Sequence, residues 1–189
     1  SLLPVIVVMM GVMITVLLQS YMTGALGDSI ETTANFTTGH VKVMTRAYSK
    51  NMSQLPIDLA IMNVDTLKKS LQTRFPAIDW TERIQFGGML DAPDQNGETR
   101  AQGNVAGIGI DLLNSTREIE RMNLRSNLVS GKFPVTKGEI LVSDELFRKM
   151  KLKIGDEVTL ISGSMYGEMS MYNFRISGTL KFGIPFLDR

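Results

Sequence analysis

The first 27 residues contain no charged side chain, and this run restricts the fold more than any other feature of the sequence. From residue 2 to residue 18 every residue is apolar or small, apart from Thr15 in the middle and Pro4 near the start. A helix rises about 1.5 Å per residue, so about 25 residues cross the roughly 30 Å hydrocarbon core of a membrane. The sequence therefore predicts a transmembrane helix over residues 1–26. A cleaved signal peptide is the alternative, but the apolar run is too long for one.

The first charges after this run indicate which side of the membrane the rest of the chain occupies. Asp28 and Glu31 come first, and no Lys or Arg occurs before Lys42. Cytoplasmic flanks carry an excess of Lys and Arg, so this flank favours an exit away from the cytoplasm. We therefore expect the rest of the chain to be periplasmic or extracellular. Residues 27–38 are rich in small residues and lack proline, so they form either a helical stalk or a flexible linker.

The charge and the cysteine content exclude several classes of function. The net charge is +1 and no face is predicted to be strongly basic, so we expect no nucleic-acid partner. The chain has no cysteine, which excludes disulfides, thiolate metal sites and a cysteine nucleophile. The 13 methionines lie partly in the membrane segment, and we expect the others to fill the core rather than to line a binding surface.

The segment after the stalk begins with a predicted strand and an amphipathic helix. Residues 40–45 alternate between apolar and polar side chains, as a half-buried strand does. Residues 64–75 repeat large apolar side chains at helical spacing, with Asn63 as the expected N-cap and a proline directly after the helix. Two further predicted strands, residues 80–90 and 99–110, flank an Asn-Gly pair that favours a tight hairpin.

The second half is predicted to be richer in strands, and the chain as a whole to be α+β. Residues 115–118 match a capping box for a short helix with Ile119 and Met122 on its buried side, and Gly131 and Pro134 end this segment. Ser143 is the expected cap of a second helix. The predicted strands of this half are residues 139–142, 158–161 and 172–180, the last two joined by a hairpin through Gly163 and Gly167.

No group of residues has the composition of a catalytic, cofactor-binding or metal site. The single histidine, His40, has no partner that would complete a catalytic or metal-binding set. The glycines of residues 103–109 lack the spacing of a dinucleotide-binding loop, and no Walker-type loop occurs. Residues 94–98 resemble the start of a calcium loop but lack its glycine and its final glutamate. We therefore expect no catalytic residue, no cofactor and no metal, and predict that the chain is not an enzyme.

A long string in the second half is similar to a hallmark of a known family. Residues 138–160, GEILVSDELFRKMKLKIGDEVTL, resemble the FtsX-like permeases of ABC transporters, and in particular the periplasmic core domain of the MacB and LolC/LolE type. Because further similarities occur in the family's order, the set is more specific than any one motif. These are GHVKV at 39–43, GIGID at 107–111, LVSGKF at 128–133, and FRISGT at 174–179 followed by Gly183 and Asp188.

This resemblance implies a two-lobed periplasmic domain on the bacterial inner membrane, with a porter-like α/β lobe at residues 39–110 and a second, strand-rich lobe at 111–189. It implies that a separate cytoplasmic subunit hydrolyses ATP and that this chain transmits the motion, as in lipoprotein release or efflux. The implied partners are the ATP-binding subunit, a second permease copy or paralogue, membrane lipid, and a lipoprotein or periplasmic adaptor. The family's pattern continues beyond Arg189 with a return segment and three more membrane helices, so we expect the chain to be part of a longer protein.

Two other functions fit parts of the sequence. A membrane-tethered sensor would bind a ligand with its extracytoplasmic domain and signal through the single helix. A membrane-anchored hydrolase would need a catalytic constellation, and none is evident among the residues. The sequence does not decide between lipoprotein release, efflux and the activation of a cell-wall hydrolase.

Overall fold

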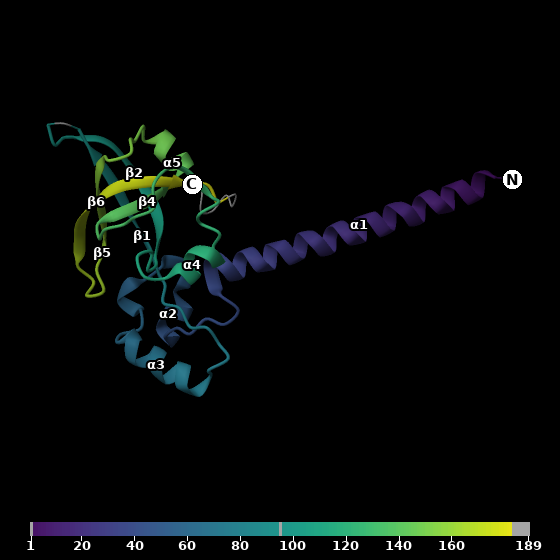
Figure 1. The fold of residues 1–189 in the computed structure, drawn as a ribbon, viewed down its shortest axis with the longest axis horizontal. Helices are drawn as coiled ribbons and strands as arrows, with labels where there is room; N and C mark the ends of the chain where they lie inside the picture. Colours follow the sequence, from purple (N-terminus) through teal and green to yellow (C-terminus); the bar gives the residue numbers. More distant parts are fainter. Residues whose placement is uncertain (1, 95, 183–189) are drawn as a thin grey trace. The chain divides into compact units, whose positions relative to one another are not determined.

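The computed structural model describes residues 2–94 and 96–182, and it divides into two compact units, Ser1–Val43 and Met44–Arg189. The first unit is dominated by one long helix and the second by one sheet (Figure 1). Each unit is described by itself. Residue 95 of the expected hairpin turn, and Gly183 and Asp188 of the expected final motif, lie outside the described residues.

The first unit contains helix α1, Leu3–Thr33, and a π-helical turn, Ala34–Thr38. The segment Leu3–Gly27 is long and apolar enough to cross a membrane. Its side chains are exposed, and the hydroxyl of Thr15 donates to the carbonyl of Gly11 at 2.8 Å, so the helix satisfies this polar group internally. The predicted membrane-length helix is confirmed. The helix also continues into the residues for which a stalk or a linker was expected.

The strand predicted at residues 40–45 is wrong. No strand pairs with this segment in the described part of the chain, and its backbone is irregular. Gly39, at φ +65°, ends the preceding π-helical turn, and its N–H donates to the carbonyl of Ala34 at 2.8 Å. Alternation of side chains indicates which face a strand would bury, but a strand also needs a neighbour for its backbone hydrogen bonds.

The second unit begins with short helices. These are α2, Arg46–Lys50, two 3₁₀ turns, Met52–Gln54 and Ile57–Leu59, and α3, Val64–Arg74. Thr45 caps α2 by accepting from the N–H of Tyr48 at 3.0 Å, and its hydroxyl donates to the carbonyl of Leu59 at 2.7 Å. The helix predicted at 64–75 is confirmed, but Asn63 is not its side-chain cap. Asn63 lies in the left-handed region at φ 54°, a conformation in which its side chain makes no capping hydrogen bond.

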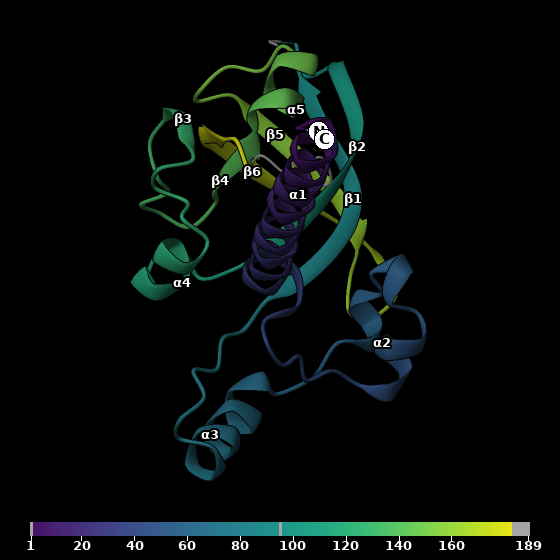
Figure 2. The ribbon, with the colours of Figure 1, turned by 90° about the vertical axis from the view of Figure 1, so that its right-hand side faces the viewer.

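A six-stranded sheet organises the rest of the second unit (Figure 2). Its strands follow the order β2-β1-β5-β6-β3, and β4 pairs with β6 in parallel, whereas the other pairs are antiparallel. The bounds are β1 Ile84–Pro93, β2 Thr99–Gly109, β3 Leu128–Gly131, β4 Glu139–Ser143, β5 Glu157–Gly163 and β6 Met169–Leu180.

The predicted β1–β2 hairpin is confirmed. The Asp94 carboxylate accepts hydrogen bonds from the backbone N–H groups of Asn96 and Glu98, at 2.8 and 2.9 Å. Gly97 takes a positive φ of 82°, which a tight hairpin turn requires and glycine adopts without strain. The Asp94 side chain is therefore occupied in shaping the turn.

Strands from both sides of the boundary expected at residue 110 belong to the same sheet. β1 pairs with β5 in the register Gly88↔Ser162 to Asp91↔Thr159, and β5 pairs with β6 along its whole length. The short strand β3 was not predicted, because Gly131 and Pro134 were expected to end a helical segment. The helix α4, Thr116–Arg121, ends earlier, and residues 128–131 pair with β6.

The core lies on one face of the sheet, under helix α5, Asp144–Lys149. As predicted, Ser143 caps this helix, and its hydroxyl accepts from the N–H of Leu146 at 3.1 Å. Val158 on β5 and Ile176 on the neighbouring strand β6 form the centre of the core. Val158 is 1 % exposed and Ile176 is 0 % exposed. The buried core residues are Leu90, Ala92, Val142, Leu146, Met150, Leu152, Val158 and Ile176.

Candidate interaction surface

The residues considered for chemistry in the sequence fall in two different units of the chain. His40 is exposed in the irregular segment after the π-helical turn. The glycines of residues 103–109 lie within strand β2, so they form no loop at a helix N-terminus. Within the described residues, no group of three or more His, Cys, Asp and Glu side chains is placed to hold a metal ion.

The densest charged cluster joins α4 to the segment before β1. Glu118, at 2 % exposure, accepts from Arg83 through Nη2 at 2.7 Å and Nε at 2.8 Å, and from Arg121 Nη1 at 2.9 Å. Arg121 also pairs with Asp79 at 2.6 Å, and Arg117 reaches the same carboxylate at 3.4 Å. Both oxygens of the Glu118 carboxylate and both oxygens of the Asp79 carboxylate therefore have an arginine partner. We name this group the Glu118 cluster, and its geometry fits an anchor between two segments rather than a reaction centre.

The Glu118 cluster also corrects the predicted capping box. Ser115 accepts from the N–H of Glu118 at 3.4 Å, as a capping box requires. The Glu118 side chain, however, turns to the two arginines instead of returning to the backbone of Ser115. Glu118 makes these hydrogen bonds because charge-assisted bonds to guanidinium groups are stronger than a bond to a neutral backbone N–H.

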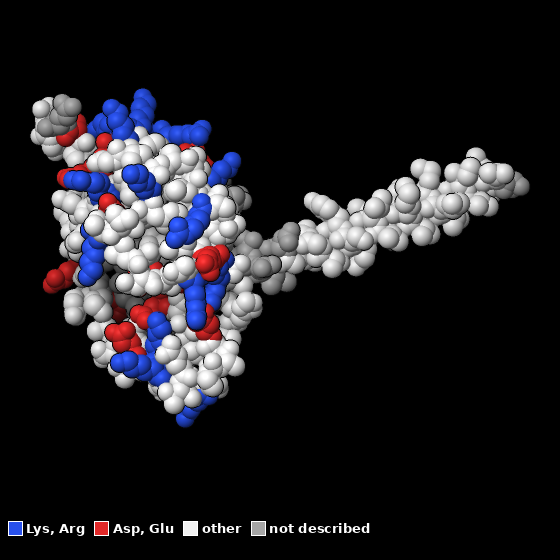
Figure 3. Space-filling model, in the orientation of Figure 1, with Lys and Arg blue, Asp and Glu red and all other residues white. Residues whose placement is uncertain are grey.

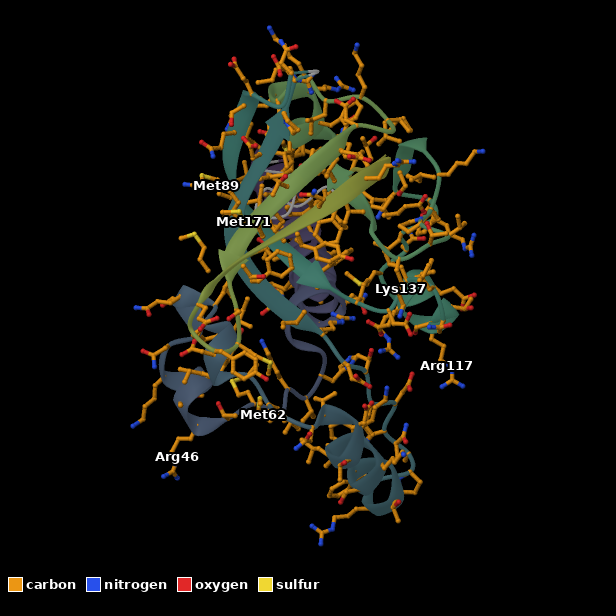
Figure 4. The ribbon with its side chains drawn as sticks, turned by 90° about the vertical axis from the view of Figure 1, so that its left-hand side faces the viewer. Arg46, Met62, Met89, Arg117, Lys137 and Met171 are labelled. Carbon is orange, nitrogen blue, oxygen red and sulfur yellow. The ribbon has the colours of Figure 1, made fainter. Side chains whose placement is uncertain are left out.

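The face of the sheet opposite the core carries an apolar row. Side chains alternate along a strand, so Met89 points away from the face that buries Leu90. Met89 lies opposite Ile161 on β5, and Ile161 lies opposite Met171 on β6. Figure 4 shows Met89 and Met171 near each other on this face.

The hairpin between β5 and β6 extends this row. Tyr166 and Met169 are 78 % and 76 % exposed, Met171 is 65 % exposed, and Met165 at the turn is 38 % exposed. The turn is well bonded, with the N–H of Ser164 donating to Glu168 at 2.6 Å and Gly167 at φ +78°. The exposure is therefore built into an ordered hairpin. Met169 lies two residues before Met171 on the same face of β6, whereas Met165 and Tyr166 lie in the turn. We call Met89, Ile161, Met169 and Met171 the methionine surface.

A polar atom without a partner borders the methionine surface. Asp91 follows Met89 on the same face of β1, and its Oδ1 is buried without a hydrogen-bond partner among the described atoms. Its cross-strand neighbour Thr159 instead donates to Asn173 at 2.9 Å. A buried oxygen without a donor costs free energy.

The methionine surface was not predicted, because the methionines outside the membrane segment were expected to fill the core. That expectation holds for Met122 and Met150, which are buried, and is wrong for Met169 and Met171. The alternation of side chains along a strand could have predicted that these two methionines are exposed. In β6, Ile176 faces the core, so residues at odd positions face outward, and Met169 and Met171 are at odd positions.

Charge does not mark out a patch in the same way on the face of the second unit that Figure 3 shows. Lys, Arg, Asp and Glu side chains are interspersed over the part of the surface that Figure 3 shows, while the described part of α1 up to Gly27 is free of charge. The apolar methionine surface is thus the stronger sign of a contact with another molecule. No protein-family model matches this sequence, and no curated protein sequence matches it.

Proposed function

We propose that this chain is the first transmembrane helix and the adjoining periplasmic domain of an ABC transporter permease subunit of the FtsX-like, MacB and LolC/LolE type. The observation that carries the proposal is an unbroken helix. α1 runs from the membrane-length segment Leu3–Gly27 to Thr33, and the π-helical turn continues it to Thr38. Because each turn of a helix is bonded to the turn before it, a displacement of the apolar segment is carried to residue 38.

The residues that resemble the family's motifs have structural roles in this proposal. Residues 138–160 form β4, the capped helix α5 and the turn into β5, and they contribute much of the core. A separate cytoplasmic subunit in the bacterial inner membrane complex would hydrolyse ATP. Strands β1 and β2 of the porter-like segment at 39–110 and strands β3 to β6 of the second segment at 111–189 would then move together, since they share a sheet.

The methionine surface offers a place for the periplasmic partner. Methionine side chains are flexible and polarisable, so they adapt to apolar surfaces of varied shape. A lipoprotein or a periplasmic adaptor would contact the exposed side chains of Met169 and Met171. In this scheme the chain performs no covalent chemistry. Its function is to transmit motion from the membrane helix to the lipoprotein or adaptor bound to the periplasmic domain.

The test is to interrupt the helix in the full-length transporter. Inserting a flexible glycine segment after Phe36 should leave ATP hydrolysis intact and abolish transport, because motion no longer passes the insertion. The same segment inserted at the exposed β1–β2 turn, after Gly97, is the matched control and should preserve transport. Full transport by the Phe36 insertion would contradict the proposal.

Co-purification separates this function from a membrane-tethered sensor. The full-length protein is extracted from its native membrane, and the proteins that travel with it are identified by mass spectrometry. Recovery of an ATP-binding subunit supports the transporter, and recovery of a kinase in its place contradicts it.

A further inference from the structure

The strand pair β5–β6 carries methionine side chains at its turn end and polar pairs at its other end. On the outward face the cross-strand pairs are Glu157 with Arg175, Thr159 with Asn173, Ile161 with Met171, and Gly163 with Met169. The first two pairs are joined by side-chain hydrogen bonds, at 3.1 and 2.9 Å. The side chains of the last two pairs contain no such polar group, so the thioether sulfurs of Met169 and Met171 are the reactive atoms at this end.

Solvent reaches these two methionines. Met169 is 76 % exposed and Met171 is 65 % exposed, and the partner of Met169 on β5 is a glycine, which has no side chain to shield it. The buried methionines Met122 and Met150 are 3 % and 5 % exposed. An oxidant must reach the lone pair of the sulfur, so susceptibility follows exposure. These two pairs of methionines therefore differ in access and not in chemistry.

The outward position also decides what oxidation does to the fold. Methionine sulfoxide is polar, and its oxygen needs a hydrogen-bond donor. At positions 169 and 171 water supplies that donor, because both side chains are exposed. The ladder between β5 and β6 is made of backbone groups, so it involves neither sulfur. At Met150 the same oxygen would lie among the apolar side chains of the core.

We propose that Met169 and Met171 are sites of reversible oxidation to methionine sulfoxide, and that this modification makes the methionine surface polar while the sheet stays folded. The modifying agent is a two-electron oxidant such as a chloramine, and a thiol-dependent reductase reverses the change. The proposal goes beyond transport and does not depend on it, since the reaction needs only an accessible thioether. An apolar contact made on this surface is lost when the surface is oxidised.

The oxidation is a two-electron transfer from sulfur to chlorine. The sulfur lone pair attacks the chlorine of the chloramine, so an S–Cl bond forms and the N–Cl bond breaks, and the amine nitrogen takes a proton. Water then displaces chloride from the sulfur and loses its two protons. The products are the sulfoxide, the free amine, chloride and one proton. In the reverse reaction two thiols become a disulfide, and the sulfoxide oxygen leaves as water.

Peptide mapping tests the site. The chain is reconstituted in lipid vesicles and treated with N-chlorotaurine, an anionic chloramine that does not enter the bilayer and so spares the methionines of α1 that lie in lipid. Trypsin releases residues 154–175 as one peptide, and fragmentation of this peptide locates the oxidised residues. Met169 and Met171 should be oxidised about tenfold faster or more than Met122 and Met150, because a buried methionine reacts only when the fold opens. Equal rates would overturn the proposal.

Two further measurements test the consequence of oxidation. Hydrogen exchange of the β5 and β6 amides should be unchanged, and faster exchange throughout both strands would show that the sheet does not stay folded. Photoincorporation of the apolar dye bis-ANS into residues 154–175 should fall several-fold. It should return when the two methionine sulfoxide reductases, one for each epimer, restore the thioethers. Labelling that does not respond to oxidation would contradict the change to a polar surface.

A variant that cannot be oxidised at these positions separates the two methionines from the others. The double substitution Met169→Leu and Met171→Leu keeps apolar side chains of similar volume, so its bis-ANS labelling should match that of the wild type before oxidation and persist afterwards. The matched control is Met62→Leu, at an exposed position away from Met89 and Met171 (Figure 4), and its labelling should fall as in the wild type. Loss of labelling in the double variant would assign the effect to other residues and overturn the proposal.

Discussion

The second unit contains two regions that are held together in different ways. Between residues 44 and 83, a stretch described throughout, Tyr48 is the one buried side chain, and none of the residues of α3 is buried. Between residues 84 and 182 the strands and α5 enclose the core around Val158 and Ile176. The helical region depends instead on local hydrogen bonds and on ion pairs such as Arg83 with Glu118. Equal substitutions in the two regions should therefore have unequal effects.

The largest effect is expected where the two regions are anchored to each other. Glu118→Ala removes the carboxylate that lies 2.7 Å from Arg83, whose side chain is only 13 % exposed. Breaking a buried ion pair from one side costs about 3–5 kcal/mol. The opening free energies of α3 and α4, measured by hydrogen exchange in lipid vesicles, should fall together.

The matched control for Glu118→Ala is an exposed pair in the same neighbourhood. Lys68 and Glu82 lie 2.7 Å apart with side chains 33 % and 41 % exposed. Glu82→Ala should cost about 0–1 kcal/mol, because water already screens this pair. If the two variants cost the same, the Glu118 cluster is not the anchor between the regions.

The next effect contrasts two apolar truncations. Ile176→Ala removes a side chain that is 0 % exposed at the centre of the core and should cost about 2–5 kcal/mol, including the cavity left behind. Leu67→Ala, on the half-buried side of α3, should cost less than about 1 kcal/mol. Hydrogen exchange of the β5, β6 and α3 amides measures both. A larger loss from Leu67→Ala would show that α3 is packed more firmly than its exposure indicates.

The same contrast explains which parts of the fold could be predicted from sequence. The elements with strong local signals, such as the Asn96-Gly97 hairpin and the Ser143 cap, were predicted correctly because a few neighbouring residues determine them. The strand at residues 40–45 was wrong and β3 was missed, because pairing depends on a distant partner that alternation does not reveal. β3 forms only because β6 offers an edge to residues 128–131.

The candidate surface was missed for a related reason. From the sequence we expected no catalytic or metal site, and we assigned the methionines by residue type rather than by position in a strand. The outward position of Met171 follows from the register of β5 with β6, which places it opposite Ile161. Glu118 has one partner, Arg121, on the next turn of its own helix, and helical spacing could have predicted this pair. Its other partner, Arg83, lies 35 residues away in the sequence, so only the tertiary fold reveals that pair.

A smaller effect is expected at the helix caps. Ser143→Ala removes the hydrogen bond to Leu146 at the start of α5 and should cost about 1 kcal/mol. Asn63→Gly at the start of α3 should cost almost nothing, because Asn63 makes no capping bond and glycine adopts its positive φ without strain. Urea unfolding in mild detergent measures both variants. A cost for Asn63→Gly as large as that for Ser143→Ala would remove the distinction between the two helices.

The smallest effect is confined to the loops of the sheet region and depends on pH. The backbone N–H groups of Val135 and Thr136 donate to the Glu139 carboxylate, at 2.7 and 3.2 Å, and hold its pKa below the usual value. A carboxyl whose pKa is lower in the folded chain stabilises the fold above its unfolded pKa of about 4.3, and this contribution is lost as the pH falls through the folded pKa. The urea midpoint of Glu139→Gln should therefore lie slightly below that of the wild type at pH 7. The difference should shrink as the pH is lowered below about 4, because both side chains are then neutral. A difference that stays constant across this range would mean that Glu139 acts through its shape and not through its charge.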